Sequence, residues 1–190
     1  MIKTKNELRF YLKEDGKRNG FEKGYFQYLF RLLCRSENAV AYHYLRALRH
    51  CEYHSGKKNI FHKLAFYYYW FKRSRIGGKH HIQIPLNKTG YGLRIMHLSG
   101  GGGVLLNVNK IGNYCGFNSG VLIGDNGSDA KPTLGDNVAF APGAKAFGKI
   151  IIGNNVFVAP NAVVTKNVPD NCIVGGVPAT ILKYKEQKEV

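Results

Sequence analysis

The sequence between residues 105 and 164 repeats every six positions, and this period constrains the fold more than any other feature. Aliphatic, aromatic or small anchor residues recur at this spacing in two registers: Leu105, Ile111, Phe117 and Ile123, and then Leu134, Phe140, Ala146, Ile152, Val158 and Val164. An α-helix has a period of 3.6 residues and a strand a period of two. A six-residue period instead predicts a parallel β-helix, in which short strands stack coil upon coil. The alternative is a run of ordinary strands separated by turns.

Packing explains the pattern around each anchor. The anchor points inward and stacks on the anchors of the coils above and below. Small residues often follow it, as expected where backbones pass close together: Gly112, Gly124, Gly135, Ala141, Gly153 and Ala159. Small or β-branched residues recur four places after the anchor: Cys115, Val121, Val138, Ala144, Val156 and Ala162. Asparagine and aspartate tolerate left-handed backbone and are predicted at the outer corners: Asn113, Asn118, Asp136, Asn137, Asn154, Asn155 and Asn161.

The positive charge is concentrated before the repeats. The chain holds 28 Lys and Arg against 12 Asp and Glu, and residues 1–83 hold 18 of these basic residues with only 6 acidic ones. Such a field attracts anionic partners. We see no nucleic-acid-binding motif, so we expect no nucleic acid among them. The four cysteines are widely spaced without a CxxC pair, which predicts neither disulfides nor a zinc site. No secretory signal is visible, so we expect a cytoplasmic protein.

The N-terminal part is predicted to be helical. Apolar residues recur at three and four positions between Phe21 and Tyr53, and a second candidate helix runs from Phe61 to Phe71. Gly77 and Gly78 are expected to break the pattern. The aromatic run ends in Lys72, Arg73 and Arg75. Two interpretations are open: the helix packs on the first coils or on a neighbouring subunit, or it contacts an anionic membrane peripherally, at the inner face.

His97 is the strongest candidate for chemistry. It is the one histidine within residues 84–190, and it lies beside four consecutive glycines, Gly100 to Gly103. Imidazole has a pKa near neutral pH, and glycines let a substrate approach the backbone, so His97 is a candidate general base. A hydrogen-bonded structural histidine is the alternative. If His97 is not the base, His80 and His81 are the next candidates.

Three segments together resemble the hexapeptide-repeat acyltransferases. They are Gly92-Leu93-Arg94-Ile95-Met96-His97, the hexads themselves, and the closing Val164-Thr165-Lys166-Asn167-Val168-Pro169 with Val174-Gly175-Gly176-Val177-Pro178-Ala179. The resemblance is to the serine acetyltransferase-like branch, which includes polysaccharide O-acetyltransferases. It implies a mainly β fold with an α-helical N-terminal part: a helical region over 1–81, a left-handed parallel β-helix over 82–183 and a tail over 184–190. It further implies a homotrimer that binds acetyl-CoA between adjacent subunits.

The resemblance also implies the roles of individual residues. His97 is the base that activates an acceptor hydroxyl for direct attack on acetyl-CoA, and a backbone N–H near Gly124 stabilises the oxyanion. The co-substrate lies along Ala141, Ala159, Thr165, Lys166 and Lys183. The loop between the two registers walls the site with Asp125, Asn126, Asp129 and Lys131. No metal is expected.

The chain departs from true serine acetyltransferases at the residues that would hold serine. Those enzymes have an aspartate before the catalytic histidine, where this chain has Met96, and an Arg-His pair in the loop, where it has Asp129 and Ala130. Loss of such charges is costly for a zwitterionic substrate. We therefore expect a neutral acceptor, a sugar or surface polysaccharide of the capsule or O-antigen type. Serine O-acetylation and a non-catalytic β-helix scaffold are the alternatives.

Overall fold

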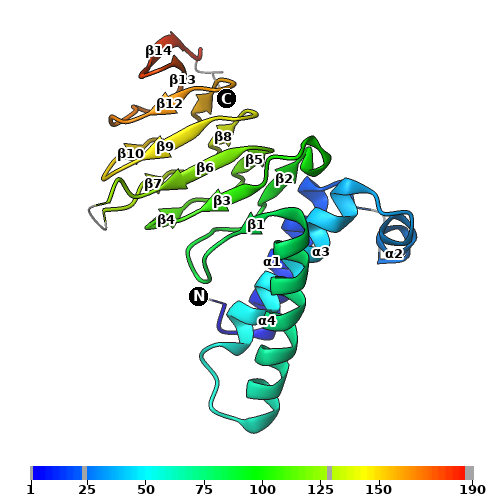
Figure 1. Cartoon of the computed structure of the whole chain (residues 1–190). Helices are drawn as coiled ribbons and strands as arrows, with labels where there is room; N and C mark the ends of the chain where they lie inside the picture. The colour runs from blue at the N-terminus through cyan, green and yellow to red at the C-terminus, as the bar shows by residue number, and fades with distance from the viewer. Residues whose placement is uncertain (1, 23–24, 128–129, 187–190) are drawn as a thin grey trace.

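The computed structural model describes residues 2–22, 25–127 and 130–186, and it places a helical part before a long β-solenoid (Figure 1). The helices are α1 (Lys5–Arg18), α2 (Tyr25–Leu33), α3 (Glu37–His54) and α4 (Ile60–His80). A short 3₁₀ helix, η1 (Leu98–Gly100), follows the second strand. The strands are β1 (Ile82–Gln83), β2 (Arg94–Met96), β3 (Val104–Leu106), β4 (Lys110–Ile111), β5 (Gly116–Asn118), β6 (Val121–Gly124), β7 (Thr133–Leu134), β8 (Ala139–Phe140), β9 (Lys145–Phe147), β10 (Ile151–Ile152), β11 (Phe157–Val158), β12 (Val163–Val164), β13 (Cys172–Gly176) and β14 (Ala179–Tyr184).

The strands form three sheets, one for each side of the coil. Sheet A has the order β1-β3-β6-β9-β12, sheet B the order β10-β7-β4 and sheet C the order β14-β13-β11-β8-β5-β2. All pairs within them are parallel except β13 with β14. The chain runs from sheet C to A to B and back to C. Each coil therefore has three corners, named here the C–A, A–B and B–C corners.

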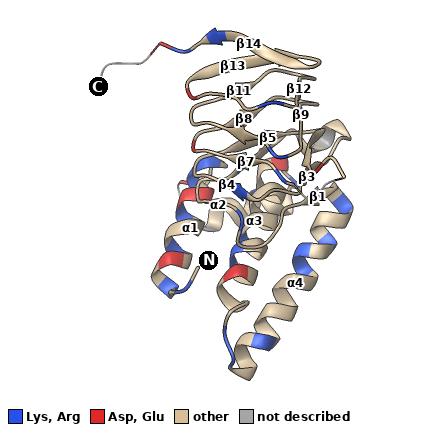
Figure 2. Ribbon diagram, turned by 90° about the vertical axis from the view of Figure 1, so that its left-hand side faces the viewer, with Lys and Arg blue, Asp and Glu red and all other residues tan. Residues whose placement is uncertain are grey.

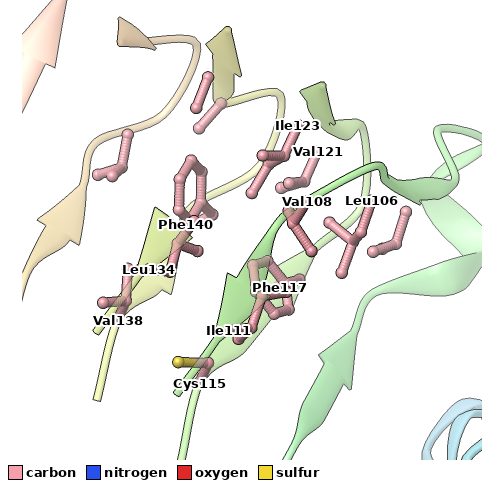
Figure 3. Packing of buried hydrophobic residues seen from close by; sticks show 14 of the residues in the cluster. Leu106, Val108, Ile111, Cys115, Phe117, Val121, Ile123, Leu134, Val138 and Phe140 are labelled. Atoms are coloured by element: carbon pink, nitrogen blue, oxygen red, sulfur yellow. The ribbon is translucent and has the colours of Figure 1, made fainter. Parts of the chain in front are cut away.

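The anchors of successive coils stack inside the prism (Figure 3). In sheet C, Ile95 pairs with Phe117, which pairs with Phe140, and the two phenyl rings stack with centroids 5.8 Å apart. In sheet B, Ile111 pairs with Leu134. Nine of the ten predicted anchors are at most 1% exposed, and so are the six small or β-branched residues named four places after an anchor. The predicted fold class, a parallel β-helix behind a helical N-terminal part, is confirmed.

One predicted anchor was wrong. Leu105 is 39% exposed on the outer face of sheet A, whereas its neighbours Val104 and Leu106 are buried. The pairing explains this, because Leu106 is in register with the inward Ile123 and Leu105 with the outward Leu122. The first coil is one residue shorter between its anchors than a hexad, so extrapolating the period back to residue 105 selects the wrong face of the strand.

Side-chain amides and carboxylates form a ladder at the B–C corner. The backbone N–H of Asn113 donates to Asp136 Oδ1 at 2.7 Å, that of Asp136 to Asn154 Oδ1 at 2.8 Å, and that of Asn154 to Asp170 Oδ1 at 2.7 Å. Each bond joins one coil to the next and satisfies an N–H that turns outward at the corner. The prediction that asparagine and aspartate lie at the outer corners therefore holds here; Asn118, by contrast, lies in β5.

The glycines at this corner are required by close packing. A Cβ on Gly135 would lie 2.5 Å from Asn154 Oδ1 and 2.9 Å from the carbonyl carbon of Gly153. Gly135→Ala is therefore expected to destabilise the fold by about 1–3 kcal/mol, the usual range for overpacking. Urea unfolding at matched protein concentration measures the change.

Gly78→Ala is the matched control, because a Cβ there meets no atom within 4 Å and the residue lies exposed in α4. Alanine favours the helix, so this variant should gain up to about 1 kcal/mol. Equal effects of the two substitutions would show that the corner relaxes freely and would contradict the packing argument.

The helical part differs from the prediction in three ways. Helix α1 was not predicted, although Thr4 and Glu7 form a capping box at its start that could be read from the sequence. The segment predicted as helical from Phe21 to Tyr53 is two helices, because the chain turns at Arg35, whose φ is +54°. Helix α4 continues through Gly77 and Gly78 to His80. Gly77 does not break the helix; a Cβ there would lie 2.6 Å from the carbonyl oxygen of Ile82.

Helix α3 closes the end of the prism. Its buried residues Ala41, Tyr44, Leu45 and Leu48 belong to the same hydrophobic cluster as the first coils. The Tyr44 hydroxyl also accepts a hydrogen bond from the backbone N–H of Ile84 at 3.1 Å. The helical and β parts therefore share one core, which holds the first coil in place.

A buried ionic network fastens the helices to the segment before β2. The Arg49 guanidinium donates to Asp15 at 2.8 Å, to Glu52 at 3.0 Å and to the Thr89 hydroxyl at 2.9 Å. Asp15 in turn accepts from the backbone N–H of Leu93 at 2.9 Å. Burial alone would lower the pKa of Arg49, but the two carboxylates raise it overall, so the side chain stays charged. This network positions strand β2, which directly precedes His97.

The cysteines are packing groups or surface thiols. Cys115 and Cys172 are fully buried inside the coils, and burial raises the pKa of Cys115 to about 12. All four cysteines are free. Within the described ranges, no helix is long and apolar enough to span a bilayer.

Candidate active site

His97 lies at the C–A corner, directly after β2. Its backbone is left-handed, with φ +57° and ψ +45°, and it caps the start of η1. The later coils place Gly120, Gly143 and Asn161 at this corner with positive φ as well. Histidine is one of the few non-glycine types that tolerate this region. The left-handed turn and the extra residues of η1 leave the imidazole exposed, and among the described residues no side chain hydrogen-bonds it.

The glycine run after His97 lets the first coil close beneath the next. A Cβ on Gly102 would lie 2.9 Å from the Cα of Gly120. The Ser119 hydroxyl donates to the carbonyl oxygen of Gly102 at 2.9 Å. These contacts hold the corner beside His97 while leaving little side-chain bulk around the imidazole.

Gly124 and the predicted substrate loop lie at the A–B corner. Gly124 ends β6, and a Cβ added to it would meet nothing within 4 Å, so its backbone is open to approach. Asp125 accepts hydrogen bonds from the Asn107 side chain at 2.9 Å and from the Gly127 N–H at 3.0 Å, which fixes the start of the loop. Asn126 is exposed and Lys131 half-buried, whereas Asp129 lies outside the described residues.

An open groove of about 560 Å³ runs along the outer face of sheet A to this corner. Its lining includes Leu105 and Leu122 on the outer face of the sheet, and Gly124 and Asp125 at the corner. Gln83 of β1 and one cation from the helical part, Arg73, also line it. Arg73 donates to the carbonyl oxygen of Ile84 at 3.3 Å, which directs it to the groove wall. Sequence reasoning treated Arg73 as part of a basic run and missed this position, because no local pattern shows which α4 residues face sheet A.

The predicted co-substrate residues divide between the two corners. Ala141 and Ala159 lie at the C–A corner, on the coils beyond His97. Thr165 and Lys166 follow β12 at the A–B corner, and both are exposed. Lys183 is exposed on β14, in register with Ile173 at the edge of sheet C. A ligand that contacts all five of these residues must extend beyond a single corner of a single chain.

His97 and Gly124 are not brought together within one chain. They lie at opposite edges of sheet A, separated by the width of a strand such as β6, roughly 13 Å at 3.3 Å per residue. The chain thus presents an imidazole at the C–A corner, and a groove with Gly124 and Asp125 at the A–B corner. A centre that uses both needs two copies.

The remaining histidines offer a weaker alternative. His43 and His50 are packed between helices, and burial with nearby cations lowers the pKa of each to about 4. His81 is exposed and left-handed at the end of α4, and His80 precedes it. In the part of the chain that the structure describes, no group of three His, Cys, Asp or Glu side chains is arranged to hold a metal.

Comparison with known proteins supports the family resemblance. A serine acetyltransferase of Synechococcus elongatus is 37% identical over 101 residues, 52% of this chain and 41% of the relative. One from Staphylococcus aureus is 38% identical over 102 residues, 52% of this chain and 47% of the relative. The resemblance to the serine acetyltransferase-like hexapeptide-repeat proteins is confirmed. No family model matches the sequence.

Solved serine acetyltransferases share the fold of this chain. The Brucella abortus protein superposes with a TM-score of 0.69 at 22% identity, over 95% of this chain and 70% of that one. The Neisseria gonorrhoeae protein gives 0.68 at 22% identity, over 96% and 67%. The Brucella abortus protein has also been solved with coenzyme A, with a TM-score of 0.63 at 22% identity over 94% of this chain and 67% of that one. The chain spans less than half the length of the curated relatives that it matches, so their activity is not transferred to it as a finding.

Proposed function

We propose that this chain is an acetyl-CoA-dependent O-acetyltransferase with His97 as its general base. The observation that carries the proposal is an exposed imidazole, held by a left-handed backbone at a β-helix corner, in a chain similar to serine acetyltransferases. A structural histidine would be packed or hydrogen-bonded, whereas this ring is presented to solvent beside glycines.

The proposed reaction is a direct transfer. A ring nitrogen of His97 takes the proton of the acceptor hydroxyl as its oxygen attacks the thioester carbonyl carbon. The oxyanion that forms is stabilised by a backbone N–H near Gly124, where the open approach leaves room for it. The C–S bond then breaks, and the imidazolium returns its proton to the leaving thiolate. No metal takes part in this scheme.

We propose a homotrimer, because the imidazole and the groove of one chain lie at opposite edges of sheet A. In a ring of three copies, the C–A corner of one copy faces the A–B corner of the next. The outer column of sheet A carries Leu105, Leu122 and Val163, with Lys145 between the last two, and the pair Leu105 and Leu122 gives such a contact an apolar surface. Acetyl-CoA would then lie in the cleft, with Ala141 and Ala159 on one wall and Thr165 and Lys166 on the other.

Serine is the acceptor that the relatives favour. The relatives are named serine acetyltransferases. The groove beside Gly124 also carries the Arg73 guanidinium, which suits the carboxylate of an amino acid, and the Asp125 carboxylate, which suits its ammonium group. These charges come from positions other than those that true serine acetyltransferases use. A sugar hydroxyl is the second candidate, and Met96 and Ala130 favour it because they leave two of the expected charged positions neutral.

Coenzyme A release measured with L-serine and with a panel of sugars and polysaccharides separates the two acceptors. With serine as the acceptor, Arg73→Gln should raise its KM about tenfold with a smaller change in kcat, because a carboxylate contact is lost. Arg75→Gln is the matched control, an exposed arginine on the same helix, and should leave KM unchanged. If only sugars are acetylated, the acceptor is a sugar hydroxyl and not serine. Failure to bind or turn over acetyl-CoA with any acceptor would favour the non-catalytic scaffold.

A further inference from the structure

The first half of α4 presents an apolar face that no described residue of this chain covers. Helix α4 packs on α3 through its inner face, where the Tyr69 ring stacks on His50 with centroids 4.2 Å apart. The outer side chains, by contrast, are 46–75% exposed: Ile60, Phe61, Leu64, Tyr67, Tyr68, Trp70 and Phe71. A helix that is apolar on both sides is normally buried on both sides, so a partner is expected on this face.

The charge around this face indicates what kind of partner it can bind. Residues 55–81 contain seven basic residues and no aspartate or glutamate: Lys57, Lys58, Lys63, Lys72, Arg73, Arg75 and Lys79. Figure 2 shows α4 at the end of the molecule opposite the last coils, with cations along it and no acidic residue. A second copy laid against α4 through the same face would bring exposed cations such as Lys63, Arg75 and Lys79 against their counterparts. An anionic surface would meet them favourably.

The residue types on the face fit a lipid surface better than a protein surface. Tyrosine and tryptophan rings sit well at the depth of lipid headgroups, with the apolar body inward and the polar atom in water. Lys58 lies exposed just before the helix and Lys63 in its first turn, and Arg75 and Lys79 lie exposed near its end, so cations lie at both ends of the aromatic stretch. This is the pattern of a peripheral anchor, which binds through buried apolar rings and attraction to anionic headgroups.

We infer that the outer face of α4 is a docking surface for an anionic phospholipid bilayer. The surface is defined by Ile60, Phe61, Leu64, Tyr67, Tyr68, Trp70 and Phe71 with their flanking basic residues. Docking there puts the helical end of the molecule at the membrane, and places the first coil with His97 nearer the lipid than the last coils. The inference goes beyond the proposed function and does not depend on it.

Co-sedimentation with vesicles tests the docking surface. The whole chain should bind phosphatidylcholine vesicles that contain phosphatidylglycerol, bind pure phosphatidylcholine at least tenfold less, and dissociate as salt is raised. Phe61→Ser, Leu64→Ser and Phe71→Ser combined should lower binding at least tenfold, and so should Lys58→Glu, Lys63→Glu and Arg75→Glu combined. The matched control, Ile151→Ser with Leu182→Ser and Tyr184→Ser, removes similarly exposed apolar residues from the β-helix and should bind as the parent does.

Sedimentation velocity of the same variants distinguishes the other occupant. If the parent does not bind anionic vesicles, the inference is wrong. If the α4 apolar variant lowers the oligomeric state while vesicle binding is unchanged, the face pairs copies of the chain and the inference is also wrong. Acetyl transfer to a soluble acceptor should be the same in parent and α4 variants. If the parent itself transfers no acetyl group, only the proposed function is contradicted, because vesicle binding needs no turnover.

Discussion

Replacing His97 with asparagine is expected to lower the rate of acetyl transfer by about a thousandfold, within the range that a general base contributes. Asparagine also tolerates left-handed backbone, so it can keep the φ of +57° at this corner without the strain that alanine would add. The affinity for acetyl-CoA and the unfolding temperature should therefore change little. Steady-state coenzyme A release, calorimetric titration with acetyl-CoA and thermal unfolding measure the three quantities.

His81→Asn is the matched control for this variant. His81 is also exposed and left-handed, with φ +54° and ψ +42°, so the substitution makes the same chemical change on the same backbone geometry. Its turnover should stay within about fivefold of the parent, since general base catalysis is lost only when the base itself is removed. If His81→Asn were inactive and His97→Asn active, the base would be His81 and the role proposed for His97 would be wrong.

Replacing Arg49 with methionine is expected to destabilise the protein by about 3–5 kcal/mol, because it leaves Asp15 and Glu52 buried without their counter-charge. The guanidinium joins α1, α3 and the Thr89–Gly90 segment through side-chain and backbone acceptors, and its side chain is fully buried. Denaturant unfolding should show a lower midpoint. Since the network also holds the strand before His97, turnover should fall in the folded fraction as well.

Lys17→Ala is the comparison for Arg49. Lys17 pairs with Glu14 at 3.1 Å, but its side chain is 45% exposed. Surface pairs contribute well under about 1 kcal/mol, so this variant should unfold close to the parent. Similar losses in both variants would mean that the Arg49 network adds no more stability than a surface pair.

The repeat domain could be predicted because its period is a direct consequence of packing. Each anchor from Ile111 to Val164 must stack on its neighbours, and the corner glycines must make room for the coil above. Leu105 is the exception, because the first coil is one residue shorter between its anchors and the six-residue period then selects the outer face of the strand. The helix boundaries were harder. The turn at Arg35 depends on a single positive φ, and the continuation of α4 through Gly77 depends on a close contact with Ile82.

The candidate site could be predicted residue by residue but not as an arrangement. The motif around His97 marked the imidazole, and the family resemblance implied Gly124 and the loop residue Asp125. Their separation to opposite edges of sheet A is a property of the coil, which the linear sequence does not show. Arg73 was missed as a groove residue because it comes from α4, and only the packing of that helix on the first coil brings it to the groove. The acceptor preference inferred from Met96 and Ala130 favoured sugars, whereas the relatives favour serine.

The proposed active site requires an imidazole and a pantetheine thiol to meet between two copies of the chain. A crystal structure of the protein with coenzyme A measures that meeting directly. We predict the thiol sulfur within about 4 Å of the His97 ring, near contact distance for reacting groups, with Gly124 of the neighbouring copy on the other side of it. Coenzyme A bound elsewhere, or a His97 ring turned away from it into a protein contact, would contradict the account.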